Sequence, residues 1–456
     1  MDAGEAVDAL QGLAALVDQS LVDQRPTPDA IAGEPRYGML ETIREFASEQ
    51  LAASGETIPA ERAFEAFLIS RAEAAEAGLS GPDQPDWLER LEAEHDNLRA
   101  GLGRAVERGD AEAALRLAPR LWRFWWLRGY LGEGRSWLER ALTLDPAADP
   151  DAIARAEFGL GKLCSDLGDF AAADKHFKAC IEVRRALGDI LGLAEALSAL
   201  AVVAVNLRTY DDARALGEEA LHISRQHGDA RVTGRALHDL AMVAREQGDY
   251  ARARPLYEES MAIWRALDDL IWIAFVTLGL GVTHLLDGQH AEARARLEEA
   301  RSLYTRLGDR YGLTIVATEL AHLARMAGEN DRAIALFGEA LQYFAEIGAS
   351  DAVVYCIECL ATLAAERNDP VMALHLFGAA RAARTTLGLP PPADRETRLL
   401  ATGIDSATRA VGADAESLLA AGQALTLEQA REESLRFVAL AAASATPAAT
   451  IDRSRG

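Results

Sequence analysis

The chain has 456 residues, half of them hydrophobic and only 6% aromatic, and its 47 lysines and arginines against 71 aspartates and glutamates give a net charge of −24. So acidic a chain is a poor match for nucleic acid or anionic membrane surfaces, because both are bound by clustered positive charge. Its four cysteines do not make a disulfide framework. With no apolar run of membrane-spanning length and an acidic start in place of a signal peptide, the chain is expected to be cytoplasmic.

Residues 1–55 are predicted to hold two short strands followed by one helix. The expected strands are Ser20–Val22 and Arg36–Leu40, joined by a loop with three prolines, and the expected helix is Glu41–Ala53. This order of elements resembles the second half of a winged-helix domain. Residues 56–110 are expected to form connecting helices.

Residues 111–150 are predicted to form a degenerate or capping repeat. Gly129–Tyr130 precedes Asp169–Phe170 by forty residues, yet Glu133 stands where the later units carry alanine. Four tryptophans crowd this segment: Trp122, Trp125, Trp126 and Trp137. An aromatic box for a ligand is one interpretation, and an aromatic core at a domain junction is the favoured one.

Residues 151–390 carry a repeat of forty residues that occurs six times. One leucine recurs without exception, at Leu160, Leu200, Leu240, Leu280, Leu320 and Leu360. An alanine recurs in the same way, at Ala173, Ala213, Ala253, Ala293, Ala333 and Ala373. Apolar residues spaced three and four apart predict a pair of amphipathic helices in each unit, and neither helix can bury its apolar face without stacking on its neighbours.

The second helix of each unit carries alanine, then a large apolar residue, then a small one, and this pattern resembles the tetratricopeptide repeat. The large position holds Phe177, Tyr257, Leu297, Phe337 and Phe377, and Gly217 interrupts it. That repeat usually has a period of about 34 residues, so the longer period here implies longer helices. HEAT-type repeats are the rival interpretation. The predicted fold is an all-α, tetratricopeptide-like superhelical solenoid of about six helix pairs with capping helices and a small winged-helix remnant.

After Gly388, a run of three prolines is expected to end the solenoid. Residues 391–442 are predicted to form C-terminal capping helices, one over 394–412 and one over 426–442. Residues 443–456 are rich in alanine, serine and threonine and are expected to be a disordered tail.

Several runs outside the repeat are similar to one family of regulators. These runs are Leu16–Val22, Arg36–Ala47, Trp87–Ala100 and Leu425–Ala430, and the resemblance covers about residues 7–437. The family is the STAND-type signal-transduction ATPases of actinobacterial and related transcriptional regulators, of the LuxR or AfsR type. In that family a nucleotide-binding core precedes the winged helix, and the repeats sense a signal. This sequence has no Gly-x-x-x-x-Gly-Lys-[Ser/Thr] motif, so the resemblance implies its sensor half without ATP or another cofactor.

Motifs for catalysis or metal binding are sparse. Cys356 and Cys359 form the only CxxC, and Cys356 falls in register with apolar positions of other units, so packing is favoured over a metal site. The histidines are scattered, and paired carboxylates carry no information in so acidic a chain. The chain is therefore predicted not to be an enzyme and to have no metal site.

Binding is favoured, because a curved stack of helix pairs has a concave face lined by the first helix of each pair. Transferring positions through the repeat predicts the ligand-contacting side chains on that face, namely Arg155, Lys162, Asn206, Arg235, His238, Met242, Arg245, Phe275, Leu278, Val282, Leu285, His322 and Arg325. Cations beside an apolar row suit a protein or peptide that presents carboxylates and apolar side chains. The alternative is that the charges are only solvated and the apolar row packs within the chain.

The predicted function is a non-catalytic sensor or protein-interaction module of a bacterial signal-transduction or transcriptional regulator. Its partner is expected to be a protein or peptide, such as an effector domain, or a small-molecule signal, with no direct nucleic acid binding and no membrane. The alternative is a free-standing scaffold with no regulatory role. An enzyme with an unrecognised site is the remote third hypothesis.

Overall fold

The structure is a computed structural model that describes residues 3–25, 35–79, 83–145, 149–392 and 394–445. It divides into two compact units. Unit 1 consists of residues 1–124 and 140–148, and unit 2 of residues 125–139 and 149–456. The boundary therefore falls inside two helices of the segment that the sequence predicts to be a degenerate repeat. No helix in the described ranges is long and apolar enough to cross a membrane.

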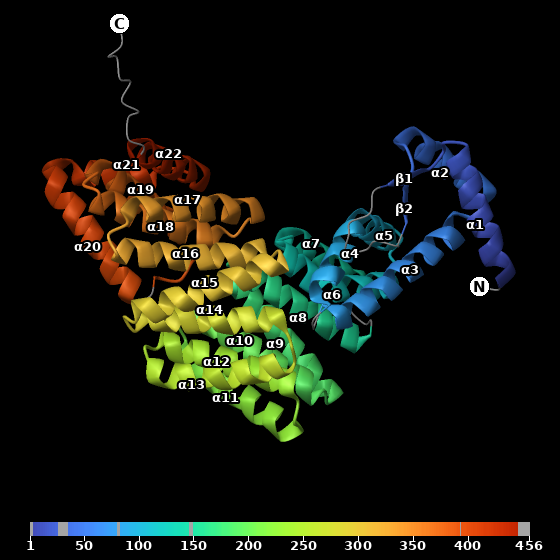
Figure 1. The fold of residues 1–456 in the computed structure, drawn as a ribbon, viewed down its shortest axis with the longest axis horizontal. Helices are drawn as coiled ribbons and strands as arrows, with labels where there is room; N and C mark the ends of the chain where they lie inside the picture. The colour runs from blue at the N-terminus through green and yellow to red at the C-terminus, as the bar shows by residue number, and fades with distance from the viewer. Residues whose placement is uncertain (1–2, 26–34, 80–82, 146–148, 393, 446–456) are drawn as a thin grey trace, which may run out of the picture. The chain divides into compact units, whose positions relative to one another are not determined.

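Unit 1 is mainly helical and carries one small hairpin (Figure 1). Its helices are α1 (Ala3–Asp18), α2 (Glu41–Ser54), α3 (Thr57–Gly78), α4 (Gln84–Ala93), α5 (His95–Glu107), most of α6 (Ala111–Arg128) and the end of α7 (Leu131–Leu144). Strands β1 (Asp23–Arg25) and β2 (Arg36–Gly38) pair antiparallel, with Gln24 opposite Tyr37. The first strand was predicted too early, at Ser20–Val22, and α1 was not predicted at all.

The packing of unit 1 is uneven along the chain. Helices α3 and α5 contact each other and bury Leu68, Leu98 and Leu102. Helix α2, in contrast, has no buried residue, and Phe46 on it is 61% exposed. The core of unit 1 therefore lies among α3, α5 and the first part of α6, while α2 lies outside it.

Unit 2 contains six consecutive helix pairs (Figure 1). The pairs are α8 (Pro150–Asp166) with α9 (Phe170–Leu187), α10 (Ile190–Asn206) with α11 (Tyr210–His227), α12 (Ala230–Glu246) with α13 (Tyr250–Ala266), α14 (Leu270–Leu286) with α15 (His290–Leu307), α16 (Arg310–Met326) with α17 (Asn330–Ile347), and α18 (Ser350–Glu366) with α19 (Pro370–Thr386). The predicted all-α solenoid of helix pairs is confirmed.

The turns between pairs follow from the recurring glycine and aspartate. Gly188 ends α9 with a φ of 69°, which glycine adopts without the steric cost that other residues bear. Asp189 follows, and its carboxylate accepts the backbone N–H of Gly192 at 2.9 Å, which caps α10. Asp229, Asp269 and Asp309 cap the next three first helices in the same way.

The pattern of small and large residues sets how closely the helices of a pair approach. The six repeating alanines are all fully buried. A Cβ added at Gly161 would lie 2.7 Å from the ring of Phe177, so the large residue of α9 packs directly on the glycine of α8. Where Gly217 replaces the large residue, the side chain of Leu240 in the next pair lies against it instead. The interrupted position is therefore filled from the neighbouring unit.

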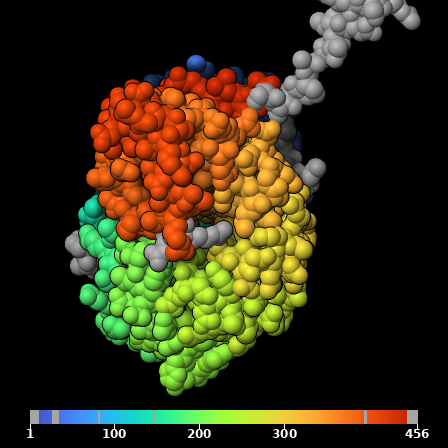
Figure 2. All heavy atoms as spheres, turned by 90° about the vertical axis from the view of Figure 1, so that its left-hand side faces the viewer, coloured from blue at the N-terminus to red at the C-terminus, as the bar shows by residue number. Residues whose placement is uncertain are grey.

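The first helices of the pairs line the concave side. Helix α12 contacts both α10 and α14, the first helices before and after it. First helices that touch across pairs lie on the shorter, inner arc of a curved stack. The space-filling view shows a hollow in unit 2 bordered by green, yellow and orange to red-orange segments of the chain (Figure 2). We call this side of α8, α10, α12, α14, α16 and α18 the inner face.

Three helices cap the last pairs: α20 (Asp394–Val411), α21 (Ala415–Gln423) and α22 (Leu427–Ala445). Helix α20 packs on α18 and α19, and α22 packs on α17, α18 and α19. Helix α21 was not predicted; it lies close against α19, because Gly378 and Gly422 leave room for the facing backbone. Most of the tail predicted to be disordered lies outside the described residues, although α22 extends to Ala445.

Candidate ligand-binding face of the solenoid

The predicted ligand residues lie on five first helices of the solenoid. Twelve of the thirteen side chains are partly buried. The exception is Leu285, which is only 2% exposed and so offers no surface to a ligand. Asn206 is turned back on its own helix, where its amide donates to the carbonyl of Val202 at 3.1 Å.

An aromatic cluster on α12, α13 and α14 reaches the inner face at His238, Trp272 and Phe275, whereas Tyr257 and Trp264 of α13 are buried. Trp272 stacks on Trp264, with ring centroids 4.9 Å apart and planes 10° apart. His238 meets Trp272 and Tyr257 edge-on, at 5.6 Å and 5.5 Å. Phe275 lies beside Trp272 at 5.5 Å. His238 and Phe275 were predicted on this face and Trp272 was not, while Tyr257 was predicted only as the large apolar residue of its repeat. The i, i+3 spacing of Trp272 and Phe275 on one helix is the signal that would have found Trp272.

A buried polar chain supports His238. The hydroxyl of Ser198 donates to one oxygen of Asp239 at 2.6 Å, and the other oxygen of Asp239 lies 2.9 Å from Nδ1 of His238. The carboxylate therefore stands between the serine and the histidine. A nucleophilic serine needs its proton taken by the histidine, so this order orients the imidazole and does not activate the hydroxyl.

The predicted cations already have carboxylate partners within the chain. Arg235 lies 3.3 Å from Glu195, and its guanidinium lies 5.3 Å from the centre of the Trp272 ring. Arg325 pairs with Glu366 at 2.8 Å. Their side chains are only 15% and 14% exposed. A ligand carboxylate would have to compete with these partners. The arginines are therefore neither free to bind a ligand nor merely solvated, the two alternatives that the sequence left open.

Arg245 is held in the same manner at the end of α12. Its guanidinium pairs with Glu246 at 2.8 Å and donates to the hydroxyl of Tyr257 at 3.4 Å. Burial lowers the pKa of Arg245, but these two neighbours outweigh it and leave the pKa above its ordinary value. Burial raises the pKa of Tyr257 to about 12. The pair therefore stays cationic and phenolic throughout the neutral range.

His322 and Tyr355 join the inner faces of α16 and α18. A hydrogen bond links Nε2 of His322 to the hydroxyl of Tyr355, and the ring of Phe337 meets the imidazole edge-on at 5.1 Å. Further along α18, Glu358 accepts from Arg384 at 2.8 Å and 3.0 Å in a bidentate pair. The His322–Tyr355 contact ties the fifth pair to the sixth, and the Glu358–Arg384 pair joins the two helices of the sixth pair.

Trp126, at the end of α6, lies against the inner face. Its ring stacks on Phe275 at 5.4 Å with the planes 13° apart. The ammonium of Lys162 lies 5.2 Å from the centre of the Trp126 ring, and the indole N–H donates to Asp166. Two predicted ligand residues, Phe275 and Lys162, are thus in contact with a residue of the chain's own α6.

Three aspartates meet where the first pair approaches the fifth and sixth. Burial raises the pKa of Asp309 and of Asp351 to about 6 each, and the charge of Asp166 adds to both shifts. Burial also raises the pKa of Asp166 itself. A side chain at Gly168 would collide with the Asp351 carboxyl, so the end of α8 lies directly against the start of α18. We call this contact the seam.

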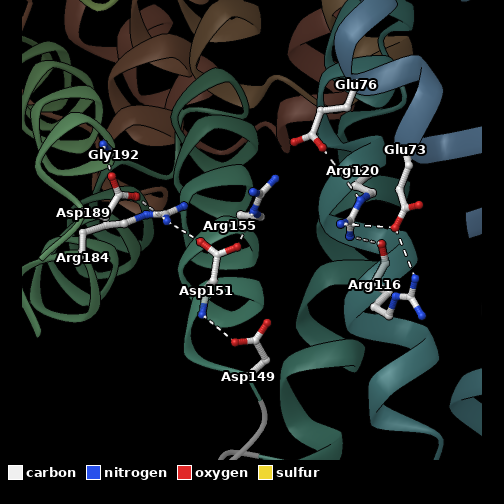
Figure 3. A network of polar contacts seen from close by, with 10 residues as sticks. All are labelled: Glu73, Glu76, Arg116, Arg120, Asp149, Asp151, Arg155, Arg184, Asp189 and Gly192. Atoms are coloured by element: carbon white, nitrogen blue, oxygen red, sulfur yellow. Dashed lines mark hydrogen bonds and ion pairs between the residues drawn. The ribbon is translucent and has the colours of Figure 1, made fainter. Parts of the chain in front are cut away.

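Elsewhere, arginines link neighbouring helices. Arg184 on α9 pairs with Asp151 and with Asp189, each at 2.6 Å, and Arg155 pairs with Asp151 at 2.8 Å (Figure 3). Arg155, a predicted ligand residue, is therefore part of a structural network. Within unit 1, Arg116 and Arg120 on α6 pair with Glu73 on α3, as the same view shows.

The CxxC pair lies in the core of the last repeat. Cys356 is fully buried in the apolar cluster of α17, α18 and α19, and burial raises its pKa. Burial also raises the pKa of Cys359. A thiol that resists ionisation is a poor metal ligand. In the described ranges, no group of three or more histidine, cysteine or acidic side chains has the arrangement of a metal site.

Comparison with known proteins supports the repeat. Models of the tetratricopeptide repeat match residues 154–187, 192–266 and 272–346. The Rap conjugation gene regulator of the plasmid pLS20, solved in complex with the Phr* peptide, superimposes with a TM-score of 0.50 over 61% of this chain and 76% of its own, at 15% identity. The solenoid thus contains tetratricopeptide repeats within residues 154–346.

Curated relatives add a class of protein. The "Putative HTH-type transcriptional regulator" Rv0890c of Mycobacterium tuberculosis and its counterpart Mb0914c of Mycobacterium bovis are each 38% identical over 136 residues. The match covers 29% of this chain and only 14% of the length of each relative. The chain therefore has a tetratricopeptide-repeat region and is homologous, over part of its length, to a transcriptional regulator.

Proposed function

We propose that this chain is a non-catalytic sensor module of a bacterial transcriptional regulator and that its inner face binds a protein or peptide. The observation that carries the proposal is the aromatic cluster around Trp272 and Phe275, which lies on the concave side of the repeats. Aromatic rings beside oriented polar groups are typical of surfaces that bind protein segments. The named function of the mycobacterial relatives and the peptide bound by the pLS20 regulator support the same conclusion.

The finer parts of the proposal rest on resemblance. The hairpin β1–β2 and helix α2 would be the second half of a winged helix that passes the signal to an effector domain. The regulator would be of the STAND and LuxR type, and it would act in the cytoplasm. The thirteen predicted residues remain the proposed contact set, with Leu285 in a supporting position and Trp272 added to the surface.

The experiment is a selection of peptides from a displayed dodecapeptide library on the full chain. We expect the enriched peptides to bind wild type and to lose at least about tenfold in affinity when Phe275→Ala removes the centre of the inner face. Arg225→Ala, on the outer helix α11, is the matched control and should leave binding unchanged. Peptides that bind the Phe275→Ala variant as well as wild type would place the ligand surface elsewhere.

If the chain is instead a passive scaffold, peptide binding should leave the conformation of the rest of the chain unchanged. Hydrogen exchange of α2 and of the turn after α6 should change when the selected peptide saturates the chain, if the module is a sensor. Exchange that changes only beneath the bound peptide would favour a passive scaffold.

A further inference from the structure

Trp126 occupies a part of the inner face that the proposed function assigns to the ligand. Its indole ring covers Phe275 on one side and lies next to the Lys162 ammonium. It is 9% exposed, so almost all of its surface is in contact with protein. Trp126 comes from α6, before the repeats, whereas Phe275 comes from the fourth pair. The contact is therefore made by a segment outside the six pairs.

The contacts of Trp126 are those that a bound aromatic side chain would make. Stacking on Phe275 uses the ring face, the Lys162 ammonium lies in cation–π range, and the indole N–H donates to Asp166. A phenylalanine could make the first two contacts but not the third. Since Asp166 is in a desolvated position, the loss of its donor would be costly unless an incoming group replaced it.

The rest of the α6–α7 turn fixes Trp126 in this position. The neighbouring Trp125 is 1% exposed and packs against Gly134, where an added Cβ would lie 2.8 Å from its ring. At Gly129, an added Cβ would lie 2.8 Å from the hydroxyl of Tyr343 on α17. The turn thus contacts the fifth pair through Gly129, and this contact does not involve Trp126.

We propose that Trp126 is an intramolecular occupant of the ligand site, and that the partner is a protein or peptide segment whose own tryptophan replaces it on Phe275, Lys162 and Asp166. This inference rests on the proposed function of the inner face. It specifies that the group recognised on the ligand is an indole. It also implies an autoinhibited state in which Trp126 of α6 occupies the site. Leu117 and Leu121, earlier on α6, are buried in the core of unit 1.

The test uses a fluorescein-labelled peptide with the sequence of residues 120–131, which contains Trp126 in its native setting. Binding to the full chain is measured by fluorescence anisotropy. Wild type, whose site is occupied, should bind the peptide at least about tenfold more weakly than Trp126→Ala, because the apparent affinity falls with the fraction of open sites. The same peptide with alanine in place of its three tryptophans, Trp122, Trp125 and Trp126, is the matched control and should bind neither protein above background.

Further variants locate the binding. Adding Phe275→Ala to Trp126→Ala should abolish the gain, whereas adding Arg225→Ala on the outer surface should keep it. Circular dichroism establishes that each variant is folded. Should Trp126→Ala fail to fold, wild type carrying 5-fluorotryptophan keeps the proposal testable. The ¹⁹F resonance assigned to Trp126 with Trp126→Phe should move when the peptide is added in excess, and no movement would overturn the proposal.

The outcomes separate this inference from the proposed function. Library-selected peptides that depend on Phe275 but bind wild type and Trp126→Ala equally well would leave the inner face as a ligand site and overturn the role of Trp126. Equal binding of the 120–131 peptide and its alanine control would likewise overturn the indole assignment. Peptides that ignore Phe275 altogether would overturn both.

Discussion

Both the inner and the outer surface of the solenoid carry pairs of arginine and glutamate, but the arginines differ in how far water reaches them. On the outer helices, Arg225 pairs with Glu259 of the next pair at 2.5 Å, and both side chains are about half exposed. On the inner face, Arg235 and Arg325 pair with their carboxylates at 3.3 Å and 2.8 Å, but their own side chains are only 15% and 14% exposed, and Arg235 also lies over the Trp272 ring. Exposed pairs are screened by water and salt, whereas desolvated pairs must stay matched. The comparison teaches that the inner face is organised around desolvated contacts and the outer one around replaceable contacts.

The largest expected effect is on the aromatic cluster. Trp264 belongs to the outer helix α13, but its ring is 1% exposed and stacks on Trp272 of the inner helix α14. Trp264→Ala should lower the free energy of unfolding in urea by about 3–5 kcal/mol, because it leaves a large cavity. Leu187→Ala, at an exposed leucine of α9, is the control and should cost less than about 1 kcal/mol. Equal losses of unfolding free energy in Trp264→Ala and Leu187→Ala would show that buried and exposed positions do not differ as this comparison requires.

A smaller effect of opposite sign is expected at the seam. Burial raises the pKa of Asp351 to about 6 in the folded chain, above its value of about 4 in the unfolded chain. The folded state therefore binds the proton more tightly, and the contribution of Asp351 to stability falls as the pH rises from about 4 to about 6. Asp351→Asn should stabilise the chain by about 1–3 kcal/mol at pH 7.5 and by little at pH 4, as urea unfolding would show.

Asp211→Asn is the matched control for the seam, because the Asp211 side chain is 99% exposed on the outer helix α11. It should change stability by less than about 0.5 kcal/mol at either pH. A loss of stability in Asp351→Asn at pH 7.5 would mean that its carboxylate is stabilised in the seam, contrary to the effect of burial.

The smallest expected effect is at the outer ion pair. Glu259→Gln removes the charge opposite Arg225 and should cost less than about 1 kcal/mol in low salt, because exposed pairs contribute little. The difference from wild type should disappear in about 1 M NaCl, where charges are screened within about 3 Å. A cost that persists in high salt would show that the outer surface also depends on desolvated contacts.

Much of the fold follows from residues that recur in register. The recurring leucine and alanine predict a pair of helices in each unit, and the structure has six consecutive helix pairs there. Helix α21 escaped prediction because it is short and lies beyond the repeat. The shift of β1 has a similar cause, since a three-residue strand leaves almost no alternating pattern to detect.

The site was harder to predict than the fold. Register alone indicates which face of a helix a residue occupies, and it placed Arg235, His238 and Phe275 on the inner face together. It does not reveal the partners of the charges, because Glu195 comes from the preceding unit and is fixed only by packing. The contact of Trp126 with Phe275 depends on how small rotations between units accumulate, which no local pattern records.

The seam changes the physical character of the stack. An open array of repeats behaves as a one-dimensional chain, in which each unit stabilises only its neighbours and the ends fray first. Here the end of α8 lies against the start of α18, so the first unit is also a neighbour of the sixth. Loosening the array at either end would release both ends at once. The six repeats are therefore expected to unfold together in one cooperative transition, whereas a linear array of the same length would unfold from its ends.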